Sequence, residues 1–263
     1  MSIRHVNGTD LFYQEQGRGT PVLLIHGTGA LGDLWMIYGG KLAAHHRVIA
    51  YDRRGYGRSS GPPATNLRQH TADAAALLTA LDAVPAAIVS HSLGGTIALD
   101  LALEHPELVA GLVAIEPPLP IQGLPDLAVV KLVLAMLLLR LIGLRRRAAE
   151  VFLHWVYTDT SGVSAFERLP GAAQAVAEET GAILADMGAG LPAHLAPERL
   201  AQITCPVTFL AGERTQPFLA KSVRTAAAHV PRSKLVIVPG VGHVLHVDRP
   251  DAVVTALEEM ISG

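Results

Sequence analysis

The sequence predicts an α/β fold, a mostly parallel doubly wound sheet with an inserted helical cap. Short apolar runs rich in β-branched residues alternate with helix-like stretches, which is the order of an α/β sheet with right-handed crossovers. One long stretch interrupts this order and shows helical periodicity without a convincing strand. The chain has 263 residues, enough to bury one sizeable core.

The strand-like runs are continuously apolar, as expected of parallel strands that helices cover on both faces. They are Val22–Ile25, Val48–Tyr51, Ala87–Val89, Leu112–Ile115, Val207–Leu210 and Leu235–Val238. Asn7-Gly8 separates two earlier runs of alternating pattern and predicts a hairpin turn between two opening strands.

Helix-like stretches separate the strand-like runs. They are Leu34–His45, Asn66–Leu81, Leu93–Glu104, Leu219–Val230 and Pro250–Ile261. The long interruption falls between Pro117 and Ile203. We therefore expect residues 1–116 and 201–263 to form the α/β core and residues 117–200 to form the cap.

Composition excludes several classes of protein. Half of the residues are hydrophobic, which excludes a disordered chain, and a net charge of -2 provides no attraction for nucleic acid. The single cysteine, Cys205, allows no intramolecular disulfide and no cysteine metal cluster. The residues from Met1 to His5 lack the apolar segment of a secretory signal, so a cytoplasmic location is expected.

The most apolar stretch runs from Leu127 to Leu144. A membrane-spanning helix needs about 20 uninterrupted apolar residues, and Lys131 and Arg140 interrupt this one. We interpret it as a lid helix with a broad apolar face, and expect no membrane span.

Ser92 is the candidate nucleophile. The segment Val89-Ser90-His91-Ser92-Leu93-Gly94-Gly95 follows a strand-like run and begins a helix-like stretch, the context of the strained turn called a nucleophile elbow. That turn needs small residues two before and two after the nucleophile, and Ser90 and Gly94 satisfy this. Ser90 itself would have Ile88 at a position that needs a small side chain. The alternative interpretation is a serine that only caps the helix.

A second motif, His26-Gly27-Thr28-Gly29, directly follows the first buried strand. A glycine-bearing turn at this point can direct a backbone N–H into the space above Ser92. The N–H groups of Thr28 and Leu93 would then form an oxyanion hole. An ordinary strand-to-helix turn is the other interpretation.

The segment from Asp52 to Ser59 (DRRGYGRS) follows the next strand, and Val241-Gly242-His243 follows the last. Together with the HG turn and the SHSLGG elbow, these motifs resemble the α/β-hydrolase superfamily over all of the chain except the cap. The resemblance implies that the DRRGYGRS loop is structural. It also implies that His243 is the catalytic base, since imidazole can take and return the Ser92 proton near neutral pH. His246 is the competing candidate, and His91 is expected to point away from the nucleophile.

The resemblance leaves the acid of the triad open. The family usually places an aspartate a few residues after the Val207–Leu210 strand, and Thr215 occupies that position here. Some superfamily members carry the acid after the preceding strand, where this chain has Glu116. Glu116 is therefore the expected acid; Glu213, or a Ser–His dyad without a carboxylate, are the alternatives.

These observations predict hydrolysis of a lipophilic carboxylic ester or lactone through an acyl-enzyme, without cofactor or metal. The apolar cap predicts a lipophilic small-molecule substrate in contact with Met136 and Trp155. A lyase, a cofactor-free oxygenase, a perhydrolase or a ligand-binding receptor on the same scaffold are the alternatives. A monomer or a homodimer fits the sequence equally well.

Overall fold

The computed structural model describes residues 2–36, 39–120, 126–169 and 172–263. Within them one eight-stranded sheet has the order β1-β2-β4-β3-β5-β6-β7-β8. Its strands are β1 Ser2–Val6, β2 Thr9–Gln16, β3 Thr20–Ile25, β4 His46–Tyr51, β5 Ala86–His91, β6 Val109–Ile115, β7 Val207–Gly212 and β8 Ser233–Val238. All the strand-like runs of the sequence lie in this sheet.

The sheet is parallel from β4 through β3 to β8, and only β1 and β2 are antiparallel. The hairpin between β1 and β2 turns at Asn7 and Gly8, both with positive φ (47° and 70°), as a tight hairpin turn requires. The predicted α/β fold with a mostly parallel sheet is thus confirmed.

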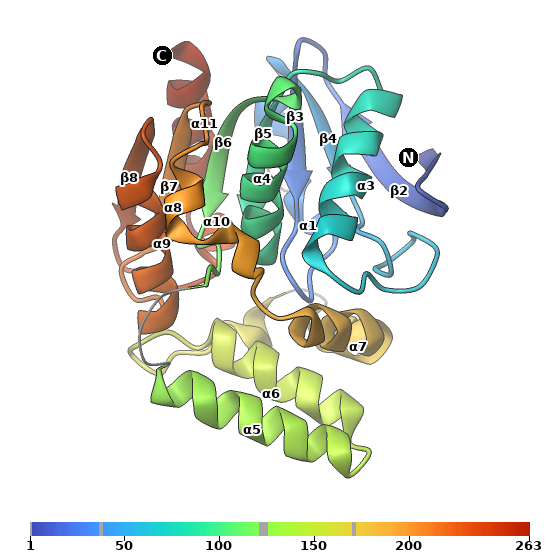
Figure 1. Cartoon of the computed structure of the whole chain (residues 1–263), viewed down its shortest axis with the longest axis vertical. Coiled ribbons are helices and arrows are strands. Elements are labelled where there is room, and N and C mark those ends of the chain that lie inside the picture. The colour runs from blue at the N-terminus through green and yellow to red at the C-terminus, as the bar shows by residue number, and fades with distance from the viewer. Residues whose placement is uncertain (1, 37–38, 121–125, 170–171) are drawn as a thin grey trace.

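Helices cover both faces of the sheet (Figure 1). One face packs against α3 Leu67–Ala80, α4 Leu93–Glu104 and α9 Pro217–His229, and the other against α1 Gly32–Trp35, α2 Gly39–Leu42 and α11 Pro250–Ser262. Short helices α8 Pro197–Leu200 and α10 Leu245–Asp248 and 3₁₀ turns at Pro106–Leu108, Phe166–Arg168 and Ala193–Leu195 complete the described elements. The single helix expected over Leu34–His45 is wrong, because α1 and α2 are separate and the second starts on Gly39-Gly40, a pair of low helix propensity.

Three longer helices, α5 Leu127–Leu141, α6 Arg145–Tyr157 and α7 Ala172–Ala189, lie together beyond the carboxyl ends of the parallel strands (Figure 1). They bury a cluster of their own that includes Leu132, Leu153 and Ile183. Among the described helices, none is both long and apolar enough to cross a membrane.

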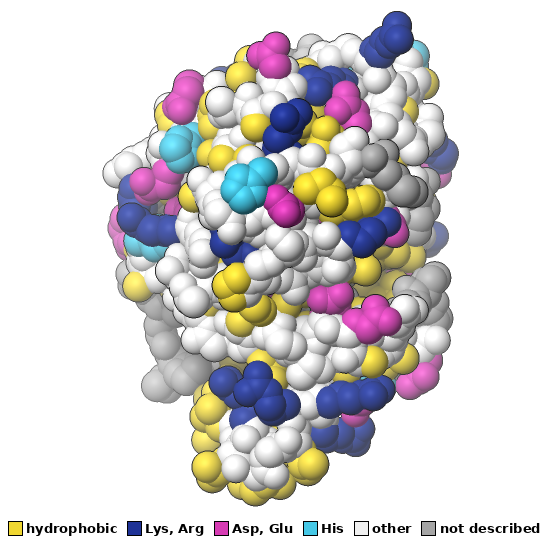
Figure 2. Space-filling view, turned by 90° about the vertical axis from the view of Figure 1, so that its right-hand side faces the viewer, with side chains coloured by type: hydrophobic (Ala, Val, Ile, Leu, Met, Phe, Trp, Pro, Cys, Tyr) yellow, Lys and Arg dark blue, Asp and Glu magenta, His cyan; other side chains and the backbone are white. Residues whose placement is uncertain are grey.

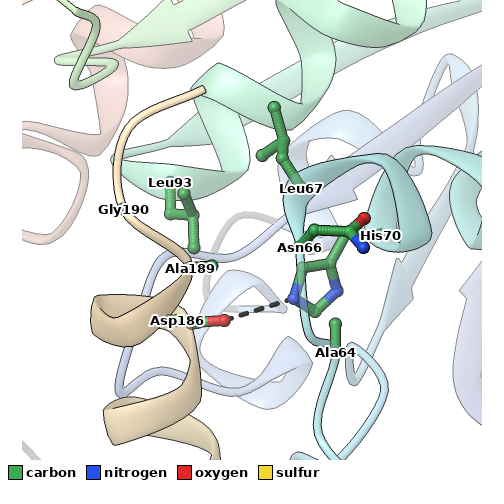
Figure 3. A pocket seen from close by; sticks show the side chains of 8 residues that line it. All are labelled: Ala64, Asn66, Leu67, His70, Leu93, Asp186, Ala189 and Gly190. Carbon is green, nitrogen blue, oxygen red and sulfur yellow. Dashed lines mark hydrogen bonds and ion pairs between the residues drawn. The ribbon is translucent and has the colours of Figure 1, made fainter. Parts of the chain in front are cut away.

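A buried charged network joins α7 to the sheet domain. The carboxylate of Asp186 accepts hydrogen bonds from Arg53 Nη2 (2.8 Å), Tyr56 Oη (2.6 Å) and Thr28 Oγ1 (2.9 Å). Figure 3 shows Asp186 pointing from α7 toward His70 of α3 across a small pocket. His70 Nε2 lies 2.9 Å from Arg53 Nη1, which can only donate, and 3.2 Å from Asp186 Oδ1, which as a carboxylate oxygen can only accept. Burial and then the Arg53 charge lower the pKa of His70, so its imidazole is neutral near pH 7.

The ionised state of Asp186 therefore stabilises the folded chain. Burial alone would raise the pKa of this carboxyl, but Arg53 and the other donors outweigh it and hold the pKa far below its ordinary value of 3.8. A depressed folded-state pKa stabilises the protein above the unfolded-state pKa, and this contribution is lost as the pH falls below it.

We predict that Asp186→Asn lowers the free energy of unfolding by about 3–5 kcal/mol at pH 7, because Arg53 is left buried without its counter-charge. Urea unfolding at pH 7 and at about pH 3 measures this, and the difference between variant and wild type should shrink at the lower pH. The control is Glu259→Gln, which breaks an exposed ion pair with Lys234 and should leave stability unchanged. Equal stability of Asp186→Asn and wild type at pH 7 would contradict this role.

Candidate active site

Ser92 sits between β5 and α4 with φ 53° and ψ -126°, a backbone conformation that non-glycine residues rarely adopt. The turn leaves no room for a side chain at Gly94, where an added Cβ would lie 2.3 Å from the Ile25 carbonyl oxygen. The strained strand–turn–helix geometry expected of a nucleophile elbow is therefore present at Ser92.

The Ser90 side chain is buried inside the protein. It is fully buried on β5, and its Oγ donates to the carbonyl of Val113 at 3.2 Å. Ser92, in contrast, lines a cavity together with residues of α5, α6 and α7. The geometry therefore favours Ser92 over Ser90 as the reactive serine.

Glu116 and His243 meet beside this turn. Glu116 follows β6 and is fully buried with φ 47°, and its Oε2 lies 2.5 Å from His243 Nδ1. The same carboxylate accepts from the N–H of Gly212 (2.7 Å) and from Thr215 Oγ1 (2.6 Å). Since a carboxylate only accepts, His243 donates from Nδ1, and its Nε2 keeps a free lone pair.

Thr215, at the position where the family usually has its acid, contacts Glu116. Thr215 carries no charge itself, but its hydroxyl holds Glu116 Oε2 in place. Glu213 is turned away and instead accepts from the N–H of Gly240 at 2.9 Å. Of the two carboxylates considered from the sequence, the structure brings only Glu116 to the histidine.

Two further histidines pack around His243. His91 contacts its ring with centroids 4.4 Å apart, and His91 Nε2 donates to the His243 carbonyl oxygen at 2.9 Å. The His246 ring stacks on Trp35, with centroids 5.1 Å apart, and lies tilted against His91, with centroids 4.0 Å apart. Burial and then these neighbouring imidazoles hold the pKa of His91 well below its usual value, and burial, with His243, lowers the pKa of His246 to about 3. Both are therefore neutral near pH 7.

The positioning role of His91 was missed from the sequence. Its Nε2–H donates to the backbone carbonyl of His243, the expected base. The signal available was a histidine directly before the candidate nucleophile, and its partner lies 152 positions further along the chain.

The backbone N–H groups of Thr28 and Leu93 remain available. Both residues line the same cavity as Ser92, and among the described residues neither N–H donates a hydrogen bond. Leu93 is the first residue of α4, where N–H groups have no partner within the helix and the helix dipole favours negative charge. An oxygen that develops negative charge next to Ser92 would find donors here.

A model of the Alpha/beta hydrolase family matches residues 22–256. The chain belongs to the alpha/beta hydrolase family. The resemblance visible in the sequence motifs is thereby confirmed.

Relatives of this α/β-hydrolase carry several activities in their names. A protein of Azorhizobium caulinodans, provisionally named carbamate hydrolase RutD, is 38% identical over 115 residues, 43% of each chain. Among solved structures, the enol-lactonase from Burkholderia xenovorans LB400 has a TM-score of 0.81 at 20% identity and covers 100% of both chains. BpoC of Mycobacterium tuberculosis H37Rv, provisionally named a non-heme bromoperoxidase, has a TM-score of 0.77 at 25% identity and covers 96% of this chain and 95% of that chain.

The cavity above Ser92 in this α/β-hydrolase has a volume of about 300 Å³ and an almost wholly apolar wall. Residues from α5, α6, α7 and α9 supply that wall: Val129, Leu132, Val133, Phe152, Trp155, Val156, Met187, Phe218 and Leu219. Asp186 is the charged residue of the lining, and the Arg53 network engages its carboxylate.

One of the two predicted cap contacts is absent from the cavity. Trp155 lines it, but Met136 does not. Met136 lies one turn beyond Leu132 on α5, where the helix packs on α6, and its side chain is buried in the apolar cluster with Ala148 and Leu153. The structure therefore does not place Met136 at the cavity wall, and its contact with substrate stays a prediction.

We predict that Glu116→Gln lowers kcat by about 10³–10⁴, because the neutral amide neither fixes the Nδ1–H tautomer of His243 nor stabilises its imidazolium. Thr215→Asp placed in the Glu116→Gln background should restore part of the lost activity, because position 215 contacts the same Oε2 atom as His243. Ester turnover and the melting temperature measure the two effects separately. A fall in kcat of less than about tenfold for folded Glu116→Gln would favour the dyad.

Proposed function

We propose that this chain is a serine hydrolase that cleaves a lipophilic carboxylic ester or lactone through an acyl-enzyme. One observation carries the proposal: a buried Glu116–His243 pair lies beside a strained Ser92 that faces an apolar cavity. A histidine held by a carboxylate, next to an accessible serine, is the arrangement that activates a hydroxyl for nucleophilic attack.

The proposed reaction proceeds in two halves. The Ser92 hydroxyl gives its proton to His243 Nε2 while Oγ attacks the substrate carbonyl carbon, and the N–H groups of Thr28 and Leu93 bind the oxyanion. The tetrahedral intermediate collapses, and the leaving oxygen takes the proton from His243. Water then gives a proton to His243 as its oxygen attacks the acyl carbon. The second tetrahedral intermediate collapses, the bond from the acyl carbon to Ser92 Oγ breaks, and Oγ takes the proton back from His243 as the acid leaves.

The hydrogen bond from Ser92 Oγ to His243 must form when substrate binds. Among the described residues, Ser92 Oγ makes no hydrogen bond, to His243 or to any other group. Catalytic hydrogen bonds are often long or poorly aligned without substrate and tighten only in the complex. Two observations therefore support His243 as the base: it lies beside the Ser92 turn, and Glu116 accepts from its Nδ1, which leaves Nε2 to take a proton.

His243 is the imidazole on which positive charge develops during the proposed reaction. His91 and His246 are neutral at pH 7, and the Glu116 carboxylate, which also accepts from Gly212 and Thr215, faces His243. When His243 accepts the Ser92 proton, the charge that develops lies 2.5 Å from a buried anion. That interaction is much stronger in a buried site than in water.

A second candidate is perhydrolysis, in which hydrogen peroxide replaces water. Peroxide would attack the same acyl-enzyme and release a peracid, with Ser92 and His243 returned to their initial states. Its support is the 38% identity over 106 residues to BpoC, provisionally named a non-heme bromoperoxidase. Peracid formation from an ester and peroxide, compared with acid formation in water, distinguishes the two candidates.

We predict that kcat/KM for p-nitrophenyl esters rises about two- to fourfold per added methylene up to medium chain length. The reason is that each half to fully buried methylene contributes up to about 0.8 kcal/mol to transition-state binding. Trp155→Ala should flatten this rise. Val163→Ala is the control, because Val163 is an exposed cap residue that does not line the cavity.

Ser92→Ala protein serves as the blank in this screen. Rates that peak at acetate and fall steadily with chain length would contradict the lipophilic assignment, and rates equal to those of Ser92→Ala would contradict ester hydrolysis. A set of lactones of matched ring size and side-chain length tests the cyclic substrates in the same way.

A further inference from the structure

The outer face of α5 is a continuous exposed apolar surface. Leu134, Leu138 and Leu141 are 60, 59 and 84% exposed, and their spacing of three and four residues places them on one side of the helix. Leu127 and Leu137 of α5, and Ile142 and Leu144 just beyond its end, extend that surface. We call these seven residues the α5 apolar face.

Packing within the chain does not account for this face. The opposite side of α5 supplies Leu132 and Met136 to the buried cap cluster, which satisfies the helix's need for one apolar stripe against its neighbours. Single exposed apolar side chains are normal on protein surfaces, but a contiguous apolar patch marks an interaction site.

Cationic side chains border the α5 apolar face. Between Asp126 and Glu150 the chain has five lysines and arginines and two acidic residues, although the whole chain carries a net charge of -2. Arg146 and Arg147 share Glu150, and among the described residues Lys131 makes no ion pair. Figure 2 shows hydrophobic side chains at the lower tip of the molecule with Lys and Arg side chains directly above them.

This combination selects the kind of partner. A second copy docked through the same face around a two-fold axis would bring two cationic borders together, which is unfavourable. An anionic bilayer offers apolar interior beneath a layer of negative headgroups, which matches an apolar face with a cationic border. At 15 residues α5 is too short to span a bilayer, but a helix of this kind lies in the interface plane.

We propose that the hairpin of α5 and α6 docks on the surface of an anionic phospholipid bilayer. The α5 apolar face enters the acyl boundary, and Lys131, Arg140, Arg145, Arg146 and Arg147 contact the headgroups. Val129, Leu132 and Val133 of the same helix line the cavity above Ser92, so docking places that cavity next to the lipid. The proposal rests on exposure and charge alone and does not require the proposed hydrolysis.

Vesicle flotation of the full chain tests this proposal. Phosphatidylcholine vesicles with about 30% phosphatidylglycerol should bind the protein at least about 100-fold more tightly than phosphatidylcholine alone, since each of the five cations near an anionic surface contributes about fivefold. Salt at about 0.5 M should remove most of that preference. The triple variant Leu134→Ser, Leu138→Ser, Leu141→Ser should lose binding by about 100-fold.

Two variants keep the result interpretable. Ile3→Ser with Ile237→Ser removes exposed apolar residues outside the cap and should bind like wild type. Lys131→Gln with Arg145→Gln removes two cations without touching the apolar face, so it should lower the preference for anionic vesicles about 20-fold even if the triple leucine variant misfolds. Melting temperatures check the fold of each variant.

Several outcomes would overturn the proposal. They are no vesicle binding by wild type, equal binding to neutral and anionic vesicles, or wild-type binding by the folded leucine variant. A dimer by light scattering that the leucine variant converts to monomer, without vesicle binding, would instead assign the face to a second copy of the chain. Loss of vesicle binding with ester turnover retained leaves the proposed function standing, so the two failures are distinguishable.

Discussion

The backbone at the carboxyl ends of β5 and β6 is the constraint on which the rest of the site depends. The two strands are in register, with His91 opposite Ile115, and the residue after each adopts positive φ: Ser92 at 53° and Glu116 at 47°. The N–H of Ser92 donates to the Ile115 carbonyl and the N–H of Glu116 to that of Leu210, so each turn is fixed to the next strand. Local strain of this kind persists only where the surrounding structure over-determines it. The sheet thereby holds a serine and a carboxylate at the same level, and His243 arrives from the loop after β8 to contact the carboxylate.

The helices α5, α6 and α7 are attached to this edge by charge as well as by apolar packing. Asp186 of α7 joins Arg53 and Tyr56 and also accepts from Thr28, whose backbone N–H is a proposed oxyanion donor. The helix that closes the cavity is thus tied to the turn that would bind the oxyanion. The hairpin of α5 and α6 carries a different balance of residues, with an apolar lining inside and an apolar face with a cationic border outside. The inner, cavity-lining side suits the proposed lipophilic acyl chain, and the outer α5 apolar face suits the proposed lipid surface.

Much of this architecture could be predicted from the sequence, because the information is local. Continuous apolar runs specify parallel strands, and small residues around Ser92 specify an elbow. Thr215 in place of the family's aspartate directed attention to Glu116, and the structure places that carboxylate on His243. Other features depend on pairs far apart in the chain, such as Arg53 with Asp186, or His91 with the His243 carbonyl, and no pattern in one sequence marks them. The place of Met136 away from the cavity wall has a related reason: an apolar helix indicates that side chains are buried, but not which neighbours bury them.

Site-resolved labelling of the serine tests the central claim, that Glu116 and His243 activate Ser92, most directly. A fluorophosphonate should add one adduct to the intact protein, mapped by peptide mass to Ser92, and the labelling rate should fall at least tenfold in folded Glu116→Gln protein, since the loss of the carboxylate removes the orientation of the base. Ser90→Ala protein should still label, and Ser92→Ala protein should not. An adduct on Ser90, no adduct on wild type, or an unchanged rate in Glu116→Gln would contradict the account.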